Sequence, residues 1–481
     1  MKKTHVFVVW FLSFLLAVIS LTPAVWAGEE YRVTYVEREK HKALFDDPRP
    51  YLKDSPIAYK NVMSPQDYAK VTYDVGKMKQ LWAEVIGFSA PDVVGKIAPE
   101  IKPGTYSYKD KEKYPGLKEL MIPDLYDKFK PGEPPFVCNF PEVKIVPTRQ
   151  YYWAVPIAEA TKKYMGKTKL DDKGYMISAS YTAGYPFPRP SGNFKAQQIL
   201  YNYEKNYYMH ENFFNLAQTL GISKRLKIDK QDAKEWFSIR LEGRVCVEPY
   251  GWLDERARMH RELRADLLVY DEPRDSFGNA FSMIQYSDPD KYDSFMIYVN
   301  ALRRIRKMSS TDTQDAVGGT DTIYEDKQGF GQKHSPTRYP YKYKVIDERE
   351  FLVPVPPTDG STFITSSNFE IRNLEFERRP LYVLELTQLD KNFVYSKRVL
   401  YIDKETLLLI YALNYDQKGR PYRSTHCLNV FIPEMGNFVP EKVVYHDLID
   451  LHNSIGNYYT LPAPWVKRGH VNLKAVVRGG K

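Results

Sequence analysis

The residues with the clearest chemical potential form a carboxylate-rich stretch that follows a basic run. The basic and acidic residues are, in order, Arg303, Arg304, Arg306, Lys307, Asp312, Asp315, Asp321, Glu325 and Asp326. Two carboxylates about 5 to 10 Å apart are sufficient for glycoside hydrolysis, so a general acid and base pair could lie here. A solvated loop with charges of both signs explains the same pattern, and we favour this interpretation.

A second group of residues could bind a divalent metal. His446, Asp447, Asp450 and His452 form the densest set of metal-ligating residue types in the chain. Imidazole and carboxylate groups at this spacing are typical ligands. At the end of a strand, however, such residues more often form a solvated, hydrogen-bonded edge. We therefore predict no metal and no cofactor.

Motifs of common catalytic sites are absent from the sequence. It contains no GxSxG, HExxH or GxxxxGK(S/T) pattern. The three cysteines, Cys138, Cys246 and Cys427, are far apart and none belongs to a CxxC pair. At most one disulfide can form among them, and three buried thiols are an equally good interpretation. No catalytic residue is predicted, and we expect a protein that is not an enzyme.

Residues 1–27 have the pattern of a secretory signal peptide. Lys2 and Lys3 give a basic start, an apolar run extends from Val6 to Ile19, and Val25-Trp26-Ala27 supplies the cleavage site. No cysteine near this site could carry a lipid, and no later segment approaches the length of a membrane span. We predict cleavage after Ala27 and a periplasmic protein.

The net charge and the aromatic content argue against a nucleic-acid-binding protein and favour a β-rich protein. The formal net charge is +9, of which Lys2 and Lys3 contribute two charges, and the remaining charges are dispersed among Asp and Glu. A nucleic-acid-binding surface needs a concentrated basic face, so nucleic acid is not an expected partner. Aromatic residues make up 14 % of the chain, with 38 Tyr, which suits the half-buried strand faces of a β-rich protein.

Residues 28–139 are expected to form an irregular N-terminal arm. The segment is rich in proline and charge, and it has one clear helix start at Ser64-Pro65-Gln66-Asp67. Ser64 is a favoured cap, Pro65 fits the first turn and Asp67 lies near the positive end of the helix dipole. We predict that this helix extends to Ile86.

A second helix is expected after the Gly184-Tyr185-Pro186-Phe187-Pro188 turn. Ala196, Ile199, Leu200 and Tyr203 follow at helical spacing and form one apolar face. Such a helix could plug the concave side of a curved sheet. A further amphipathic segment, Met209 to Leu226, is expected before the strands begin.

Most of the remaining chain has the pattern of a β-meander. The expected strands are Trp236 to Val247, Arg264 to Tyr270, Phe277 to Tyr286, Ser294 to Asn300, Phe351 to Pro354, Leu381 to Gln388, Phe393 to Ile402, Leu407 to Tyr415, Ser424 to Ile432 and Pro440 to Leu448. We predict a mainly β protein with helices (α+β), in which residues 140–465 form a large curved antiparallel sheet, a half-barrel around internal helices. Residues 466–481 are expected to be a tail.

Two stretches of the sequence are its most specific features for recognising a protein family. Ala301 to Asp326 contains Leu302-Arg303-Arg304-Ile305-Arg306 and then Gly318-Gly319-Thr320-Asp321, and Ser396 to Arg423 reads as strands around two tight turns. Together they resemble the LolA/LolB-like family of periplasmic lipoprotein carriers. The resemblance is closer still to a larger periplasmic relative, a family of unknown function often encoded beside exporters of the resistance-nodulation-division type. This similarity covers roughly Ile97 to Leu461 and includes the 184–188 turn with Asn193.

The resemblance implies a carrier with a gate. In such proteins the loop after the basic strand covers the open side of the sheet, and here Gly318 and Gly319 would give it freedom to swing, with Asp321 beside them. Ile199, Leu200 and Tyr203 would line the apolar face, and Arg303 and Arg304 would meet an anionic head group.

We therefore expect a periplasmic carrier or chaperone. It would bind a lipid or another apolar ligand and move it between an inner-membrane exporter and the outer membrane, because acyl chains are costly to expose to water. Its partners would be the lipid, the exporter and an outer-membrane protein. The alternatives are an envelope-polymer hydrolase that uses an Asp/Glu pair, and a non-catalytic adaptor of an envelope complex.

Overall fold

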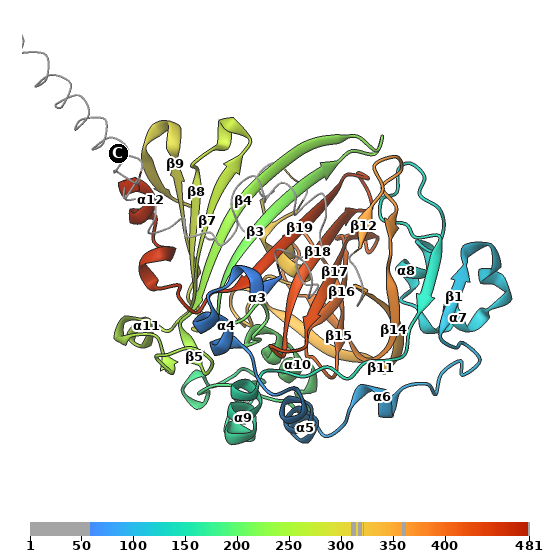
Figure 1. Ribbon diagram of the computed structural model, residues 1–481, viewed down its shortest axis with the longest axis horizontal. Coiled ribbons are helices and arrows are strands. Elements are labelled where there is room, and N and C mark those ends of the chain that lie inside the picture. The colour runs from blue at the N-terminus through green and yellow to red at the C-terminus, as the bar shows by residue number, and fades with distance from the viewer. Residues whose placement is uncertain (1–57, 309–313, 316–319, 321, 358–361, 480–481) are drawn as a thin grey trace, which may run out of the picture.

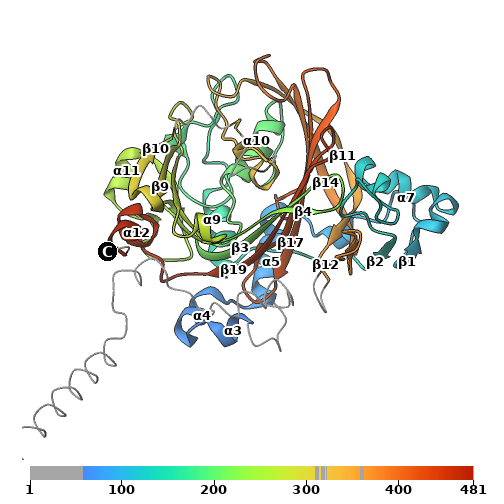
Figure 2. The ribbon, with the colours of Figure 1, turned by 90° about the horizontal axis from the view of Figure 1, so that it is seen from above.

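The computed structural model describes residues 58–308, 314–315, 320, 322–357 and 362–479. One large, strongly curved sheet dominates it, and Figure 2 shows this sheet curving around helix α10 (Lys195–Glu204). The sheet does not close into a barrel, because β10 and β11 remain at its two ends. The predicted half-barrel of a mainly β protein with internal helices is confirmed.

Thirteen of the fifteen strands that the described residues contribute to the sheet form two meanders, each built from strands that are neighbours in sequence and in space. The first comprises β3 Asn212–Ile222, β4 Ile228–Arg240, β7 Glu262–Glu272, β8 Ala280–Tyr286, β9 Ser294–Val299 and β10 Arg304–Lys307. The second comprises β11 Tyr341–Val355, β14 Glu375–Gln388, β15 Lys397–Asp403, β16 Leu409–Tyr415, β17 Pro421–Ile432, β18 Asn437–Asp447 and β19 Asn453–Pro462. Two short hairpins, β5 Glu242–Arg244 with β6 Gly251–Trp252 and β12 Phe363–Ile364 with β13 Ile371–Arg372, lie outside it.

One antiparallel pair joins the two meanders. β19 pairs with β3 along its whole length, from Asn453 opposite Ile222 to Pro462 opposite Phe213. The free ends of the two meanders, β10 and β11, are therefore at opposite edges of the sheet. The chain between Lys307 and Tyr341 has to travel from one edge to the other, and its described part does so across the concave side (Figure 2).

The convex side is covered by elements from both ends of the chain. The N-terminal part supplies α3 Tyr59–Val62, α4 Pro65–Val71, β1 Gly104–Ser107, α7 Pro115–Leu120, α8 Pro123–Asp127 and β2 Glu142–Ile145, and the C-terminal part supplies α12 Leu473–Gly479. Leu117 and Leu125 pack with Val399 and Tyr401 of β15. β2 is the exception to the antiparallel pattern, because it runs parallel to β14.

One end of the half-barrel is filled by α5 Val75–Ile86, α9 Val155–Tyr164 and aromatic residues that include Trp82 and Trp153. Two further short helices, α6 Ala90–Val93 and α11 Glu255–His260, lie beside this end (Figure 1). None of the helices in the described part of the chain combines the length and apolar character needed to cross a bilayer.

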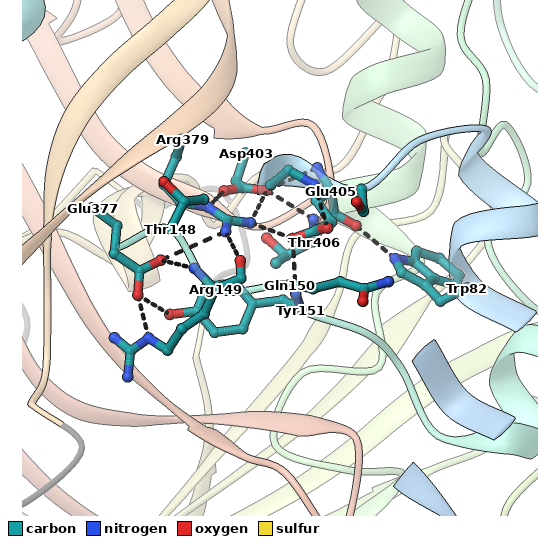
Figure 3. A network of polar contacts seen from close by, with 12 residues as sticks. Trp82, Thr148, Arg149, Gln150, Tyr151, Glu377, Arg379, Asp403, Glu405 and Thr406 are labelled. Atoms are coloured by element: carbon teal, nitrogen blue, oxygen red, sulfur yellow. Dashed lines mark hydrogen bonds and ion pairs between the residues drawn. The ribbon is translucent and has the colours of Figure 1, made fainter. Parts of the chain in front are cut away.

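A buried polar network fixes the N-terminal part to the sheet (Figure 3). Its centre is Glu405, in the turn between β15 and β16. The Glu405 carboxylate accepts hydrogen bonds from the backbone N–H groups of Ala90 (2.8 Å) and Tyr151 (2.9 Å) and from the Arg379 guanidinium (2.6 Å). The Trp82 indole donates to the Glu405 carbonyl at 2.7 Å. Segments that are distant in sequence therefore meet at one turn.

The helix predicted from Ser64 to Ile86 is in fact two helices. Ser64 caps the first as expected, accepting from the Asp67 N–H at 3.1 Å, but this helix ends at Val71. Asp74 then caps a second helix by accepting from the Lys77 N–H at 2.6 Å. The break arises because Thr72 is extended, and the Tyr73 N–H donates to the Glu434 carbonyl rather than to a helical partner.

The strand prediction was wrong at one place and incomplete at several others. It began β4 at Trp236 instead of Ile228, and β11 at Phe351 instead of Tyr341. The segment Met209 to Leu226 contains strand β3 rather than an amphipathic element preceding the sheet, and β19 was not predicted. These two strands are each other's partners. Most of β3 is buried on both faces, so its residues do not alternate between apolar and polar as those of a one-sided strand do.

Candidate functional site

Helix α10 lies on the concave side of the second meander. Ile199 and Leu200 are 0 % and 1 % exposed, and they belong to one apolar cluster with Leu384 of β14 and Leu400 of β15. Tyr203 packs against this cluster, and its hydroxyl donates to the Gln328 carbonyl at 3.1 Å. The apolar face predicted for this helix therefore covers the inside of the sheet.

The second element on the concave side is residues 322–334, which we call the inner segment. It contains the short 3-10 turn η6 Tyr324–Gly329. Two backbone-to-backbone hydrogen bonds lie within this segment, from Asp326 N–H to Ile323 O and from Gly331 N–H to Glu325 O. The inner segment is thus not a strand of the sheet, and side chains attach it to its surroundings.

Toward the first meander, the inner segment is held by aromatic and polar contacts. The Tyr324 ring packs edge-on against Phe295 with centroids 4.9 Å apart, and the Gln285 amide donates to the Tyr324 hydroxyl at 3.3 Å. Lys333 forms an ion pair of 3.1 Å with Asp293. These contacts fix the segment to β8 and to the start of β9.

Toward the second meander, the same segment is held by buried ion pairs. The Asp326 carboxylate lies 3.6 Å from the Arg398 guanidinium and 3.8 Å from that of Arg423. It also accepts hydrogen bonds from the Tyr395 hydroxyl (2.6 Å) and the Asn414 amide (3.3 Å). Glu325 lies 3.7 Å from Arg398, so two carboxylates share this guanidinium.

This arrangement explains why the two distinctive stretches of the sequence occur together. Glu325 and Asp326 end the first stretch, and Arg398, Asn414 and Arg423 belong to the second. Burial raises the pKa of Asp326, and the Arg398 and Arg423 guanidinium groups and the Tyr395 hydroxyl offset this only in part. The two carboxylates face arginines rather than an open cleft, so they attach the segment to the sheet.

A glycine allows the inner segment to lie close to the sheet. Gly329 has a φ of +89°, in the left-handed region where a side chain is strained. A Cβ added there would also collide with the side chain of Leu409 in β16. The positive φ therefore favours glycine at this crossing point, and a side chain there would also displace that of Leu409.

A cavity of about 120 Å³ remains between the inner segment, the end of α10 and the first meander. Its lining includes Tyr208, Phe213, Trp236, Arg264, Lys327 and Gln332. The lining therefore combines aromatic rings with basic and amide groups, and it also includes the carboxylates of Glu204 and Asp293.

The other residues predicted for the site lie elsewhere. Arg303 and Arg304 are exposed at the start of the edge strand β10, and they do not line this cavity. Gly318, Gly319 and Asp321 lie outside the described residues. The hinge role predicted for the two glycines stays a prediction.

Three of the four residues considered as metal ligands have another partner, and the fourth, Asp450, is exposed. Asp447 pairs with Arg423 at 3.3 Å, His452 with Asp229 at 3.0 Å, and His446 Nδ1 lies 2.9 Å from the Asn453 side-chain oxygen. In the part of the chain that is described, no group of three or more His, Cys, Asp or Glu side chains is arranged to hold a metal ion.

The three cysteines are free thiols in the structure. Cys427, on β17, faces the concave side, where its Sγ lies 3.5 Å from the Gln328 carbonyl oxygen. Burial raises the pKa of the Cys427 thiol to about 12. Sequence reasoning did not connect this cysteine with the site, because nothing in the pattern of β17 shows that it lies beneath the inner segment.

Comparison with known proteins adds a family. A family model described as a protein of unknown function, DUF1329, matches residues 122–469, which is more than half of the chain. The chain belongs to the DUF1329 family. A DUF1329 family protein from Desulfovibrio piger is 16 % identical, with a TM-score of 0.40, over 55 % of this chain and 91 % of that chain.

Two further solved structures are similar to this DUF1329 chain. One is a putative outer membrane lipoprotein-sorting protein domain from Vibrio parahaemolyticus, with 15 % identity and a TM-score of 0.41 over 59 % of this chain and 96 % of that chain. The other is a LolA superfamily protein from Nitrosomonas europaea, with 14 % identity and a TM-score of 0.33 over 56 % and 97 %. No curated protein sequence matches the chain.

Proposed function

We propose that this DUF1329 protein is a periplasmic carrier that holds an apolar ligand, such as a lipid, on the concave side of its curved sheet. The proposal rests on one observation. Helix α10 and the inner segment cover the concave face of the sheet, and the sheet itself does not close into a barrel. The sequence supports the location through the signal-peptide pattern of residues 1–27.

The ligand would take the place of side chains that now fill the concave side. The cavity of about 120 Å³ is too small for a long acyl chain. Ile199, Leu200 and Tyr203 of α10 would move away from Leu384 and Leu400, and the ligand would cover the exposed apolar surface. Each methylene removed from water stabilises the complex by about 0.8 kcal/mol, so a chain of moderate length offsets the lost packing.

The inner segment would act as the gate in this proposal. It lies outside the sheet, two backbone-to-backbone hydrogen bonds lie within it, and it is held by ion pairs and hydrogen bonds at both ends. Movement of this segment would not break a strand pair. The sequence analysis proposed a gating loop around Gly318 and Gly319. We propose that the gate also includes the inner segment, residues 322–334.

Arg303 and Arg304 keep the role proposed from the sequence, contact with an anionic head group, but only as exposed charges on the edge strand. The exporter and the outer-membrane protein remain proposed partners. A hydrolase has less support, because Glu325 and Asp326 are both engaged with buried arginines.

A disulfide lock tests the proposal. The variant Gln328→Cys adds a thiol to the residue whose carbonyl lies 3.5 Å from Cys427 Sγ, so oxidation should tie the inner segment to β17. Binding of the fluorescent apolar probe N-phenyl-1-naphthylamine is then measured for the oxidised and the reduced protein. We expect slow or lost uptake when oxidised and full recovery after reduction.

Two controls make the result decisive. The variant Gln328→Cys with Cys427→Ser cannot form the lock, so the oxidant should leave its uptake unchanged. Solvent extraction of the protein purified from a periplasmic fraction, followed by mass spectrometry, should yield about one lipid per chain. A protein that contains no lipid and does not bind the probe in either redox state would refute the carrier.

A further inference from the structure

Two basic side chains face the cavity without a carboxylate partner. Arg264 extends from β7, and Lys327 extends from the inner segment on the opposite wall. Arg264 donates one hydrogen bond, to the Ser238 hydroxyl at 2.9 Å, and Lys327 Nζ lies 4.6 Å from the centre of the Trp236 ring. Within the described residues, neither cation forms an ion pair, and each lies beside an aromatic ring.

The other two basic residues at the cavity differ from this pair. The Arg240 guanidinium donates to the carbonyl groups of Glu242, Asn206 and Lys205, so it holds the backbone in place. Lys333 pairs with Asp293 at 3.1 Å and donates to neighbouring carbonyls. Arg264 and Lys327 therefore differ from these two residues, because within the described part of the chain neither of them forms an ion pair.

At these two cations the effect of burial outweighs that of the nearby carboxylates. Burial lowers the pKa of Arg264 to about 10, and Asp266 only partly offsets this because Arg240 opposes it. Burial also lowers the pKa of Lys327, despite the carboxylates of Asp266 and Asp293. A buried cation without a partner is costly, so an anion that entered the cavity would be bound favourably.

An unpartnered amide adds a second, independent sign of a ligand site. Gln332 lines the same cavity and is 7 % exposed, and within the described structure neither its side-chain oxygen nor its nitrogen has a hydrogen-bond partner. Buried amides are almost always hydrogen-bonded. Its NH₂ group is a donor suited to an anionic oxygen.

The cavity and the proposed gate are connected through two residues that are adjacent in the sequence. Asp326 and Lys327 are neighbours, yet Asp326 faces Arg398 on the second meander and Lys327 faces Trp236 on the first. Attachment of the segment through Asp326 therefore also places Lys327 over the cavity.

We propose that this cavity binds the anionic group, a carboxylate or a phosphate monoester, of an amphiphilic ligand. Arg264 and Lys327 supply the positive charge from opposite walls, and Gln332 donates a hydrogen bond. The proposal rests on the carrier function and specifies the ligand class as an anionic amphiphile. A volume of about 120 Å³ suits such a head group, while the tail extends beneath α10.

Competition experiments with matched probes test this assignment. Dodecanoate, dodecan-1-ol and inorganic phosphate each compete with N-phenyl-1-naphthylamine at neutral pH, for the wild type and for Arg264→Gln, Lys327→Gln and Arg306→Gln. Arg306 is an exposed cation on β10, so Arg306→Gln changes the net charge equally but does not touch the cavity. Thermal unfolding establishes that each variant is folded.

We expect the wild type and Arg306→Gln to bind dodecanoate about tenfold or more tightly than dodecan-1-ol. Arg264→Gln and Lys327→Gln should each lose most of this preference, while their affinity for dodecan-1-ol stays the same. Two variants on separate elements protect the test against a folding defect in one of them.

The outcomes separate this inference from the carrier proposal. If neither the probe nor dodecan-1-ol binds the wild type, both the carrier function and this inference are wrong. If dodecanoate and dodecan-1-ol bind equally, or if the cavity variants keep the preference, the anionic subsite is overturned while the carrier stands. Tight binding of inorganic phosphate alone, lost in the cavity variants, would overturn the head-group assignment in favour of a free anion.

Discussion

Arg398 and Asp326 form an ion pair of 3.6 Å in which both side chains are withdrawn from water, with exposed fractions of 0 % and 2 %. One residue is part of the sheet and the other is part of the inner segment. The pair therefore joins the two elements whose separation the carrier proposal requires.

Removal of the arginine should destabilise the fold. In Arg398→Met, Glu325 and Asp326 lose their shared cation, and breaking one side of a buried ion pair costs about 3 to 5 kcal/mol. We expect the free energy of unfolding in urea to fall by about 3 kcal/mol. Arg420→Met removes an exposed partner of Asp416 and should have little effect. Equal losses in the two variants would contradict the central role of Arg398.

Loosening the inner segment should expose Cys427. Asp326→Asn keeps the shape of the side chain but removes its charge, so the contacts with Arg398 and Arg423 weaken. We expect alkylation of Cys427 to accelerate about tenfold, corresponding to about 1.4 kcal/mol of easier opening. Peptide mass spectrometry measures the rate, and Cys138, buried on the convex side, serves as the control in the same sample. The prediction fails if both thiols accelerate together.

A charge on the inner face of α10 should be poorly tolerated. Ile199→Asp places a carboxylate among Leu384, Leu400 and other apolar side chains. We expect a loss of about 3 kcal/mol or more in the free energy of unfolding and a lower melting temperature. Gln197→Asp, at a half-buried position of the same helix, is the matched control. An unchanged melting temperature for Ile199→Asp would show that this face is not packed in solution.

Acid should destabilise the protein in part through His334. Burial lowers the pKa of His334 to about 3, from an ordinary value of 6.5. The unfolded chain therefore binds a proton between about pH 6.5 and 3 that the folded protein does not, so stability falls as the pH falls through this window. The loss approaches about 1.4 kcal/mol per pH unit for this one group.

The variant His334→Phe isolates this contribution. The His334 ring packs against Tyr201 with centroids 4.2 Å apart, and phenylalanine keeps a ring at this position without titrating. The difference in unfolding free energy between pH 7 and pH 5 should be smaller in the variant than in the wild type. Identical differences would mean that His334 is accessible to protons in the folded state.

The sequence predicts the local elements of this fold better than their long-range partners. Strands β14 to β18 were recognisable because each pairs with the next strand in the sequence and the connections between them are short. β3 was misread and β19 overlooked, and they pair with each other across more than two hundred residues. Their register depends on contacts that no local pattern contains.

The site follows the same rule. Ile199, Leu200 and Tyr203 could be predicted because they share one face of one helix. Arg264, Lys327 and Gln332 could not, since the first lies on β7 and the other two lie on the inner segment, and only the curvature of the sheet brings these elements together. Arg303 and Arg304 were predicted as site residues because they belong to a dense run of basic residues. Such a run does not reveal which side of a sheet the end of a strand faces.

The pairing of β3 with β19 also bears on how the chain is completed during synthesis. β3 begins at Asn212 and has to wait for its second neighbour until residues 453–462 have left the ribosome. Until then, the edge of each meander that will later join the other exposes unpaired backbone groups, and such groups favour aggregation. A chain that stops before Asn453 would keep both edges open, so the last long strand decides whether the molecule is one sheet or two unprotected halves.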